Sequence, residues 1–357
     1  MKSRFPGFYH PDGSFYDVLF KDAIIVLDTN ILLDLYRVSP KTSKELLEII
    51  KTLGDRIWIP YQVALEYHRD LFTVVEGQIN KYNEAAKTIE SIRKTFLEKR
   101  SHPFLSDDLH KKATEVFEDL LQFFGNQEKE LENVILEQSV KDELCKLLDS
   151  KIGDSFKPEE LDKIYQEGEE RFKIQVPPGY MDRNKPGNEK FGDLVVWKEI
   201  IRKSKEEKRP VLFVTDDTKE DWFVRFRGKT YGPHPQLLKE FQDATGCQIY
   251  IYTLERFLEN SEKLKIQVTE TTLDELKARK EQDKDAVSGQ ISLYDDIQSE
   301  SSNEATMAPS IDQQIMSNIA KKMLANRKGQ VRITIPAESD DEVDSGITED
   351  DSSSSSE

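Results

Sequence analysis

Two short, uninterrupted apolar runs constrain the fold of this chain more than any other feature of its sequence. Residues 23–27 are Ala-Ile-Ile-Val-Leu, and residues 211–214 are Val-Leu-Phe-Val. Runs without polar alternation are typical of strands that are buried on both faces of a parallel sheet. Residues 57–59 and 248–252 predict two further strands, and helical patterns separate the four. This alternation predicts an α/β fold with a mostly parallel sheet and helices on both faces.

Acidic residues follow both of these apolar runs, where each strand is predicted to end. Asp28 comes directly after the first run, and Asp216 and Asp217 follow the second. In open parallel sheets the ligand crevice lies beyond the carboxyl ends of the strands, so we expect these acids to meet in space. Glu66 and Asp193 lie near the starts of two predicted helices, and such helix starts face the same end of the sheet.

A cluster of carboxylates predicts a divalent cation, because the negative charges repel one another and a cation removes that penalty. Mg²⁺ and Mn²⁺ prefer oxygen ligands, whereas the five histidines form no H-x-x-x-H pattern that would favour zinc. One or two such ions suit phosphodiester hydrolysis, since a metal lowers the pKa of a bound water. A hydrolase of small phosphoesters would use the same acids equally well.

Each acid also has a purely structural interpretation. Asp28 and Asp193 could cap the helices that follow them. Asp216 and Asp217 could be turn residues, and Glu66 could be a solvated helix charge. The joint occurrence of acids at two strand ends and two helix starts favours a site over these separate interpretations.

The charge distribution predicts an acidic tail. The formal net charge of −17 argues at first sight against a nucleic-acid partner, but residues 271–357 contain 19 acidic and 9 basic residues. Their Ser-, Asp- and Glu-rich composition is typical of disordered chain. Within the tail, residues 315–324 could form a helix and residues 331–335 a strand that bind a protein partner. The tail could instead fold back over the site, or serve solubility alone.

Other sequence features indicate a cytoplasmic protein. No apolar run reaches the roughly 18 residues of a membrane span. Residues 1–22 lack the basic start and apolar stretch of a secretory signal. Cys145 and Cys247 are far apart and form neither a disulfide framework nor a zinc motif.

The acids and their neighbours resemble the motifs of the PIN-like domain family, which is related to the flap endonucleases. Residues 28–32, Asp-Thr-Asn-Ile-Leu, are similar to the first motif, in which Asp28 is a metal ligand and Asn30 supports the site. Glu66 and Asp193 are similar to the second and third acids of the family. The resemblance implies that these acids bind Mg²⁺ or Mn²⁺.

Residues 214–217, Val-Thr-Asp-Asp, resemble the fourth motif, which usually has the form Thr-x-Asp. This form favours Asp217 over Asp216 as a catalytic metal ligand, although Asp216 stays a candidate, and it gives Thr215 an orienting role. Asp221, which is followed by an aromatic residue, is a further candidate metal ligand.

The resemblance covers roughly residues 20–260 and implies a three-layer αβα nuclease domain at residues 23–267. An N-terminal extension at residues 1–22 would precede it, and the acidic tail at residues 268–357 would follow. A helical insertion at about residues 75–175, which small PIN domains lack, resembles that of a bacterial subfamily. The implied activity is metal-dependent endonuclease cleavage of RNA or of single-stranded or structured DNA, in a toxin or antiphage effector. The rival interpretation is a PIN-like module that has lost catalysis and serves as a nucleic-acid-binding or protein scaffold.

Basic and aromatic residues flank the third and fourth acids and predict contacts with a nucleic-acid substrate. Phosphate contacts position a backbone without specifying its sequence, and aromatic rings stack on unpaired bases. Tyr180, Trp222 and Tyr231 could provide such stacking, although core packing is the favoured interpretation of Trp222. The candidate phosphate contacts are Arg183, Lys185, Lys190, Arg225, Arg227 and Lys229.

Overall fold

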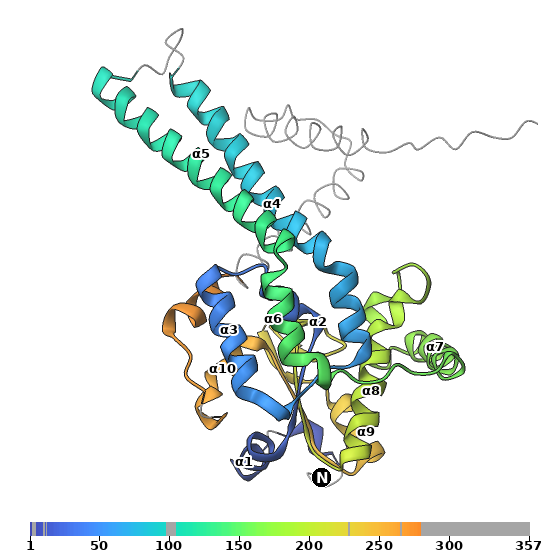
Figure 1. The fold of residues 1–357 in the computed structure, drawn as a ribbon. Coiled ribbons are helices and arrows are strands. Elements are labelled where there is room, and N and C mark those ends of the chain that lie inside the picture. The colour runs from blue at the N-terminus through green and yellow to red at the C-terminus, as the bar shows by residue number, and fades with distance from the viewer. Residues whose placement is uncertain are drawn as a thin grey trace, which may run out of the picture. The chain divides into compact units, whose positions relative to one another are not determined.

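Four parallel strands form the central sheet, in the order β2-β1-β3-β6 (Figure 1). They are β1 (Ile24–Leu27), β2 (Ile57–Trp58), β3 (Val211–Val214) and β6 (Ile249–Tyr252). Leu27 pairs with Val214, and Val214 pairs with Tyr252, so three strands end at the same level. Every residue of β1 and β3 is buried, which is why these runs lack polar alternation. The predicted parallel sheet is confirmed.

The computed structural model describes residues 1, 5–9, 11, 13–97, 105–227, 229–264 and 266–279. All of them belong to one compact unit that spans residues 1–286. The helix and the strand predicted at residues 315–324 and 331–335 lie outside the described residues. Within the described part of the chain, no helix combines the length and the apolar character that a membrane crossing requires.

Helices cover both faces of the sheet, with α3 and α10 on one side and α8 and α9 on the other (Figure 1). The helices of this layered body are α1 (Gly13–Asp22), α2 (Thr29–Asp34), α3 (Pro40–Leu53), α8 (Gly192–Glu207), α9 (Pro235–Thr245) and α10 (Leu254–Glu259). Short 3-10 helices are η1 (Pro6–Phe8), η2 (Gly54–Arg56), η3 (Asp149–Lys151), η4 (Tyr180–Asp182), η5 (Gly187–Phe191) and η6 (Ser261–Leu264). The predicted αβα layering is therefore confirmed.

Two long helices extend beyond the sheet as an antiparallel pair, α4 (Tyr61–Leu97) and α5 (Asp107–Leu136) (Figure 1). The Tyr82 and Phe124 rings lie 6.3 Å apart between them, and Asn83 Nδ2 donates to Glu128 Oε1 at 3.1 Å. Two further helices, α6 (Ser139–Leu148) and α7 (Pro158–Lys173), return the chain to the sheet. The predicted helices of this region are present, although α4 passes through residue 75, the expected start of the insertion, without a break.

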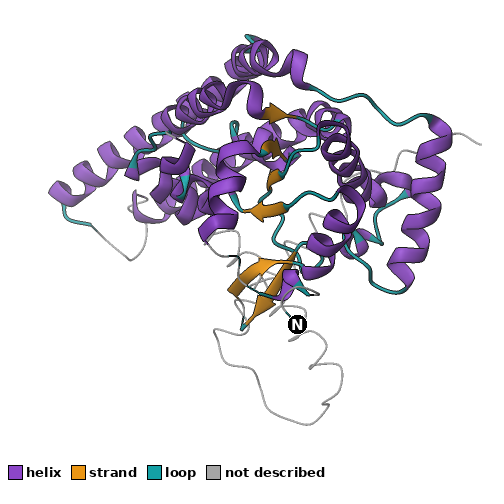
Figure 2. Cartoon of the chain, turned by 90° about the horizontal axis from the view of Figure 1, so that it is seen from below, coloured by secondary structure: helices purple, strands orange, loops and turns teal. Residues whose placement is uncertain are grey.

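A separate antiparallel hairpin consists of β4 (Phe223–Phe226) and β5 (Lys229–Pro233), which stand apart from the four-stranded sheet in Figure 2. A register shift between Val224 and Arg225 interrupts the pairing. The sequence did not predict this hairpin, because most of its residues are exposed and show no continuous apolar run.

Residues 270–279 are helical and pack against α3, at the start of the predicted tail. Glu275 Oε2 accepts a hydrogen bond from Thr42 Oγ1 at 2.6 Å. Arg279 forms an ion pair of 2.6 Å with Asp34, whose side chain is fully buried in α2. This part of the chain therefore contributes contacts to the body, whereas the proposed tail boundary at residue 268 stays a prediction.

Candidate active site

Asp28 connects β1 to α2 and receives three hydrogen bonds from neutral donors. Its Oδ1 accepts from the Thr29 backbone N–H at 2.7 Å, which makes Asp28 the N-cap of α2. Its Oδ2 accepts from Asn30 Nδ2 at 2.7 Å and from Thr215 Oγ1 at 2.6 Å. The structural interpretation as a helix cap is thus correct, but the second oxygen is held by side chains from two separate motifs.

Asn30 and Thr215 join the ends of β1 and β3 through hydrogen bonds. Thr215 is fully buried, and its hydroxyl accepts from Asn30 Nδ2 at 3.1 Å and from the Asp217 backbone N–H at 3.0 Å. Asn30 Oδ1 accepts from the Asp216 backbone N–H at 2.9 Å. One hydroxyl therefore links the orientation of Asp28 to the backbone position of Asp217.

The two neighbouring aspartates after β3 have different surroundings. Asp216 Oδ1 accepts from the Leu254 backbone N–H at 3.0 Å, where α10 begins. Asp217 Oδ1 accepts from the Lys219 backbone N–H at 3.1 Å, and its Oδ2 forms an ion pair of 2.8 Å with Lys219 Nζ. Asp216 thus supports the start of α10, while the preference for Asp217 over Asp216 as a metal ligand stays a prediction.

Glu66 lies on α4 between the β1–α2 junction and the start of α8. Its Oε2 accepts from Thr29 Oγ1 at 3.1 Å, and its Oε1 accepts from Gln62 Nε2 at 2.8 Å. A Cβ atom at Gly192 would lie 2.5 Å from Glu66 Oε1. Only glycine allows this approach without a shift, and the approach brings Glu66 beside Asp193, the next residue of α8.

Asp193 lies in the first turn of α8, whose N-cap is Phe191, so the interpretation of Asp193 as a cap is wrong. Its Oδ2 accepts from Trp222 Nε1 at 3.3 Å. Burial and the negative charge of Asp217 raise the pKa of the Asp193 carboxyl well above its usual value, and Asp28 adds to the shift. These carboxylates therefore lie close enough to influence one another electrostatically.

Asp28 has a raised pKa for similar reasons. Burial raises the pKa of its carboxyl from 3.8 to about 7, against the lowering effect of the Thr215 hydrogen bond, and the charge of Glu66 adds to the increase. Ionisation of both Asp28 and Asp193 is thus energetically unfavourable without a nearby cation. A bound divalent ion would remove that cost.

Lys219 provides the positive charge on the other side of the cluster, a role that the sequence did not suggest. Its Nζ lies 2.8 Å from Asp217 Oδ2 and 2.9 Å from Asp182 Oδ1. Burial lowers the pKa of this ammonium, but the charges of Asp217 and Asp193 outweigh that effect and raise it overall. The sequence feature that could have indicated this role is a lysine two residues after the fourth acid.

Asp221 fixes a loop. Its Oδ2 accepts from the backbone N–H groups of Gly179 and Met181, at 3.0 and 3.1 Å. The side chain is buried, and burial raises its pKa. Within the described residues Asp221 Oδ1 has no hydrogen-bond partner. These contacts position the loop at residues 177–181, while the role of Asp221 as a metal ligand stays a prediction.

Glu199, on α8, is a buried acid that sequence reasoning missed. Only 1% of its surface is exposed, and its Oε2 accepts from the Gln62 backbone N–H at 3.1 Å, in the first turn of α4. Burial raises its pKa from 4.5 to about 7, and Glu66 contributes. Glu199 therefore holds the helix turn that precedes Glu66. The sequence feature that could have indicated this role is an acid on an otherwise apolar helix face.

The predicted substrate contacts divide into two groups. Lys185 forms an ion pair with Asp182, and Lys190 forms one with Glu169. The other four form no ion pair with any residue that the structure describes: Arg183, Arg225, Arg227 and Lys229. The predicted phosphate contacts of these four cations therefore stay a prediction.

The predicted stacking residues also differ in exposure. Trp222 is 1% exposed and packs against Trp197 and Phe213, so it belongs to the core, as its structural interpretation predicted, and does not stack on bases. Tyr180 is buried too, whereas Tyr231 is 62% exposed. An aromatic residue beside a catalytic motif has the same sequence signature whether its ring faces the core or the substrate.

The donor chemistry of the cluster fits a hard divalent cation. Asp28, Glu66, Asp193 and Asp217 offer carboxylate oxygens, which Mg²⁺ and Mn²⁺ prefer. Among the residues that the structure describes, however, no three acidic, histidine or cysteine side chains converge closely enough to hold a metal ion. The positive charge beside Asp217 comes from Lys219 instead.

Comparison with known proteins identifies the family. Residues 24–237, more than half of the chain, match the family model described as PIN like domain. The match extends from β1 to the first turn of α9 and includes all four acids of the cluster. No curated protein and no solved structure matches the chain. PIN-like domains are generally nucleases, bind nucleic acid and typically use divalent metals. The chain therefore belongs to the PIN-like domain family.

Proposed function

We propose that this protein is a metal-dependent endonuclease that hydrolyses phosphodiester bonds of RNA or of single-stranded or structured DNA. The observation that supports it most is the network around Thr215, which joins Asp28 at the end of β1 to Asp217 after β3. Glu66 and Asp193 approach the same place from α4 and α8. Retention of four acids with their supporting Asn30 disfavours an inactive scaffold.

In this proposal the four carboxylates hold one or two Mg²⁺ or Mn²⁺ ions. When bound, such an ion lowers the pKa of a water molecule and stabilises charge on the phosphate. Thr215 and Asn30 orient Asp28, because both donate to its Oδ2. Lys219, whose Nζ lies beside Asp217, supplies a positive charge for an oxygen of the scissile phosphate.

The substrate is a polymer rather than a small phosphoester in this proposal. Arg225, Arg227 and Lys229 lie together on the β4–β5 hairpin, and Arg183 lies just after η4. Their lack of ion-pair partners among the described residues leaves four positive charges for successive phosphates. A small phosphoester needs no such extended set of cations.

The decisive experiment is cleavage of labelled RNA, single-stranded DNA and duplex DNA with Mg²⁺ or Mn²⁺. Wild type is compared with Asp28→Asn, Asp217→Asn and a matched control, Asp243→Asn, whose carboxylate is exposed on α9. We expect cleavage by wild type and the control, and loss in the other two. Metal-dependent cleavage that survives both site substitutions, or no cleavage of any polymer, contradicts the proposal. Hydrolysis of a small phosphoester alone favours the rival phosphatase.

The resemblance to a bacterial subfamily extends the proposal to a toxin or antiphage effector. Expression of such a nuclease in a bacterial host should slow growth, whereas the Asp28→Asn variant should not. Equal growth with both forms, in the presence and absence of phage, would contradict this role while leaving the nuclease activity untouched.

A further inference from the structure

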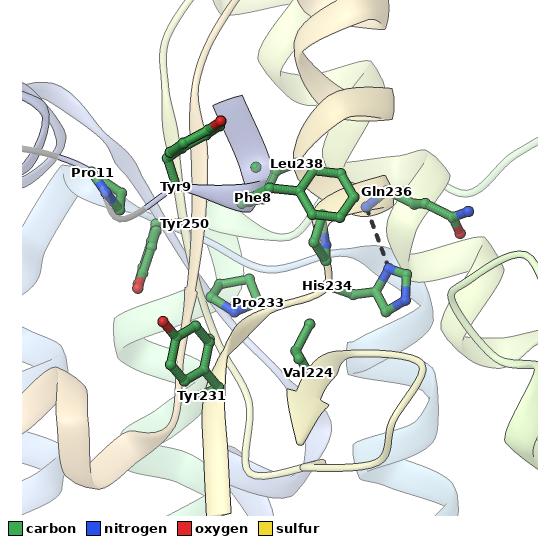
Figure 3. Close-up of a pocket in the computed structure, with 13 residues that line it drawn as sticks. Phe8, Tyr9, Pro11, Val224, Tyr231, Pro233, His234, Gln236, Leu238 and Tyr250 are labelled. Carbon is green, nitrogen blue, oxygen red and sulfur yellow. Dashed lines mark hydrogen bonds between the residues drawn. The ribbon is translucent and has the colours of Figure 1, made fainter. Parts of the chain in front are cut away.

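An aromatic pocket of about 330 Å³ lies between the N-terminal segment, the hairpin and α9 (Figure 3). Its walls include Phe8, Tyr9, Tyr231, Pro233, His234 and Tyr250, and "the aromatic pocket" hereafter means this set. Figure 3 places the Tyr231 and Tyr250 rings on one side of Pro233 and the Phe8 ring near Leu238. The volume lies at the lower end of the range for small-molecule sites.

Close backbone packing holds the pocket together. A Cβ atom at Gly7 would lie 2.8 Å from the Pro235 carbonyl oxygen, so η1 approaches the start of α9 as closely as glycine allows. His234 Nδ1 accepts from the Gln236 backbone N–H at 3.3 Å and caps α9 (Figure 3). The N-terminal wall and the α9 wall are therefore held at a fixed spacing.

The hairpin that forms one wall carries three positive side chains that form no ion pair with the residues the structure describes. Arg225, Arg227 and Lys229 are exposed and form no ion pair with any described residue, and none of them lines the pocket itself. Exposed aromatic rings lie among them, since Phe226 is 65% and Tyr231 is 62% exposed. Cations interleaved with exposed rings are typical of surfaces that bind single-stranded nucleic acid.

The same hairpin connects the pocket to the carboxylate cluster. Trp222, the residue before β4, donates through Nε1 to Asp193. Its carbonyl oxygen accepts from the His234 backbone N–H at 2.8 Å. A residue of the pocket wall is thus joined by one hydrogen bond to a residue that contacts the candidate active site.

We propose that the aromatic pocket binds one unpaired nucleobase of the substrate strand, while the hairpin cations hold its phosphates. The inference rests on the proposed nuclease function and narrows its substrate to strands with an unpaired or extruded base. Stacking on Tyr231 requires the flat face of a base, which a base pair inside a duplex does not expose. An intact duplex therefore leaves the pocket unused.

The first test combines an abasic scan with a substitution. A single abasic nucleotide is placed at successive positions on either side of the cleaved bond, and kcat/KM is measured for wild type, Tyr231→Ala and the control Phe123→Ala. Phe123 is a 52% exposed ring on α5, outside the pocket. We expect one position where base removal costs wild type and Phe123→Ala about five- to hundredfold, and Tyr231→Ala almost nothing. Cleavage that is indifferent to base removal at every position overturns the inference and leaves the nuclease proposal intact.

The second test does not depend on cleavage. Asp28→Asn protein is titrated with an oligonucleotide that carries one 2-aminopurine, whose fluorescence is quenched when it stacks. We expect quenching with Asp28→Asn, and loss of this quenching when either Tyr231→Ala or Gly7→Ala is added. Tyr231→Ala removes the stacking ring, and Gly7→Ala displaces η1 from Pro235. Unchanged quenching in both double variants overturns the inference. If a proline-rich peptide binds the pocket and no oligonucleotide displaces it, the inference is also overturned, in favour of a peptide site.

Discussion

Asp28 and Asp217 both follow buried strands of one sheet and are linked through the same threonine hydroxyl, yet their charges are compensated differently. Asp28 accepts three hydrogen bonds from neutral groups and forms no ion pair with a described residue. Asp217 forms an ion pair with Lys219, which also contacts Asp182. One side of the cluster is therefore neutralised by the chain itself. On the other side, neither Asp28 nor Asp193 forms an ion pair with a described residue, although Lys219 partly offsets the charge of Asp193. This difference indicates that an external cation would stabilise the protein most near Asp28.

The largest expected effect comes from removing a charge on the uncompensated side. Asp28→Asn should lower metal-dependent cleavage at least about 100-fold, because metal stabilisation of the reacting phosphate amounts to several kcal/mol. Without metal, this variant should have a Tm at pH 8 that is no lower than that of wild type. The reason is that the substitution removes a carboxylate that is buried and ionised at this pH. A marked loss of Tm would mean that the charge of Asp28 stabilises the fold, and it would contradict the comparison.

The next effect comes from breaking the link between the two sides. Thr215→Val keeps the shape of the side chain but removes the hydroxyl that donates to Asp28 and accepts from Asp217. We expect a loss of about 10- to 100-fold in metal affinity or in kcat, as for other residues that orient metal ligands. Thr215→Ser should restore most of the activity. Equal loss in both variants would indicate a packing defect instead.

A smaller effect should appear in the pH dependence of stability. The pKa values of Asp28 and Glu199 are raised to about 7 by burial, so the folded protein keeps protons that the unfolded chain has released. The free energy of unfolding of the metal-free protein should therefore fall as pH rises from about 4 to 7, and should level off above that. Mn²⁺ should raise Tm more at pH 8 than at pH 5. Thermal unfolding across this range checks both statements, and a Tm that rises throughout would contradict them.

The smallest effect is expected on the compensated side. Lys219→Gln removes the internal cation, but the lysine is 37% exposed, so the free energy of unfolding should fall by only about 1 kcal/mol. Because Asp217 then lacks its ion-pair partner, whereas Asp182 keeps Lys185, Mn²⁺ should raise Tm by more than it does in wild type. Lys203→Gln, which breaks a different ion pair, with Glu207, serves as the control. An identical metal effect in all three proteins would show that Lys219 does not compensate the cluster.

Strand positions and the acids beyond them could be predicted from sequence, because both depend on local patterns. A strand buried on both faces, such as β1 or β3, must be continuously apolar, and parallel strands present their carboxyl ends together. The order of the strands and the approach of Gly192 to Glu66 were not predicted, and only the structure gives them.

Other parts of the site depend on contacts between distant residues and left no local pattern. The Lys219–Asp182 ion pair joins two loops, and Glu199 acts on a helix that starts more than a hundred residues earlier. The β4–β5 hairpin lacks an apolar run because it is exposed. Trp222 had both a stacking and a core interpretation, and the structure shows that it is buried, with its indole N–H donating to Asp193.

The central claim is that carboxylates from two different strands share one divalent cation site, and counting bound Mn²⁺ by electron paramagnetic resonance tests it most directly. Wild type should bind one or two ions per chain, and Asp28→Asn and Asp217→Asn should each lose the tightest of them, while Asp243→Asn binds like wild type. Loss in both variants would tie the ends of β1 and β3 to the same ion. Unchanged Mn²⁺ binding in either variant would contradict the account.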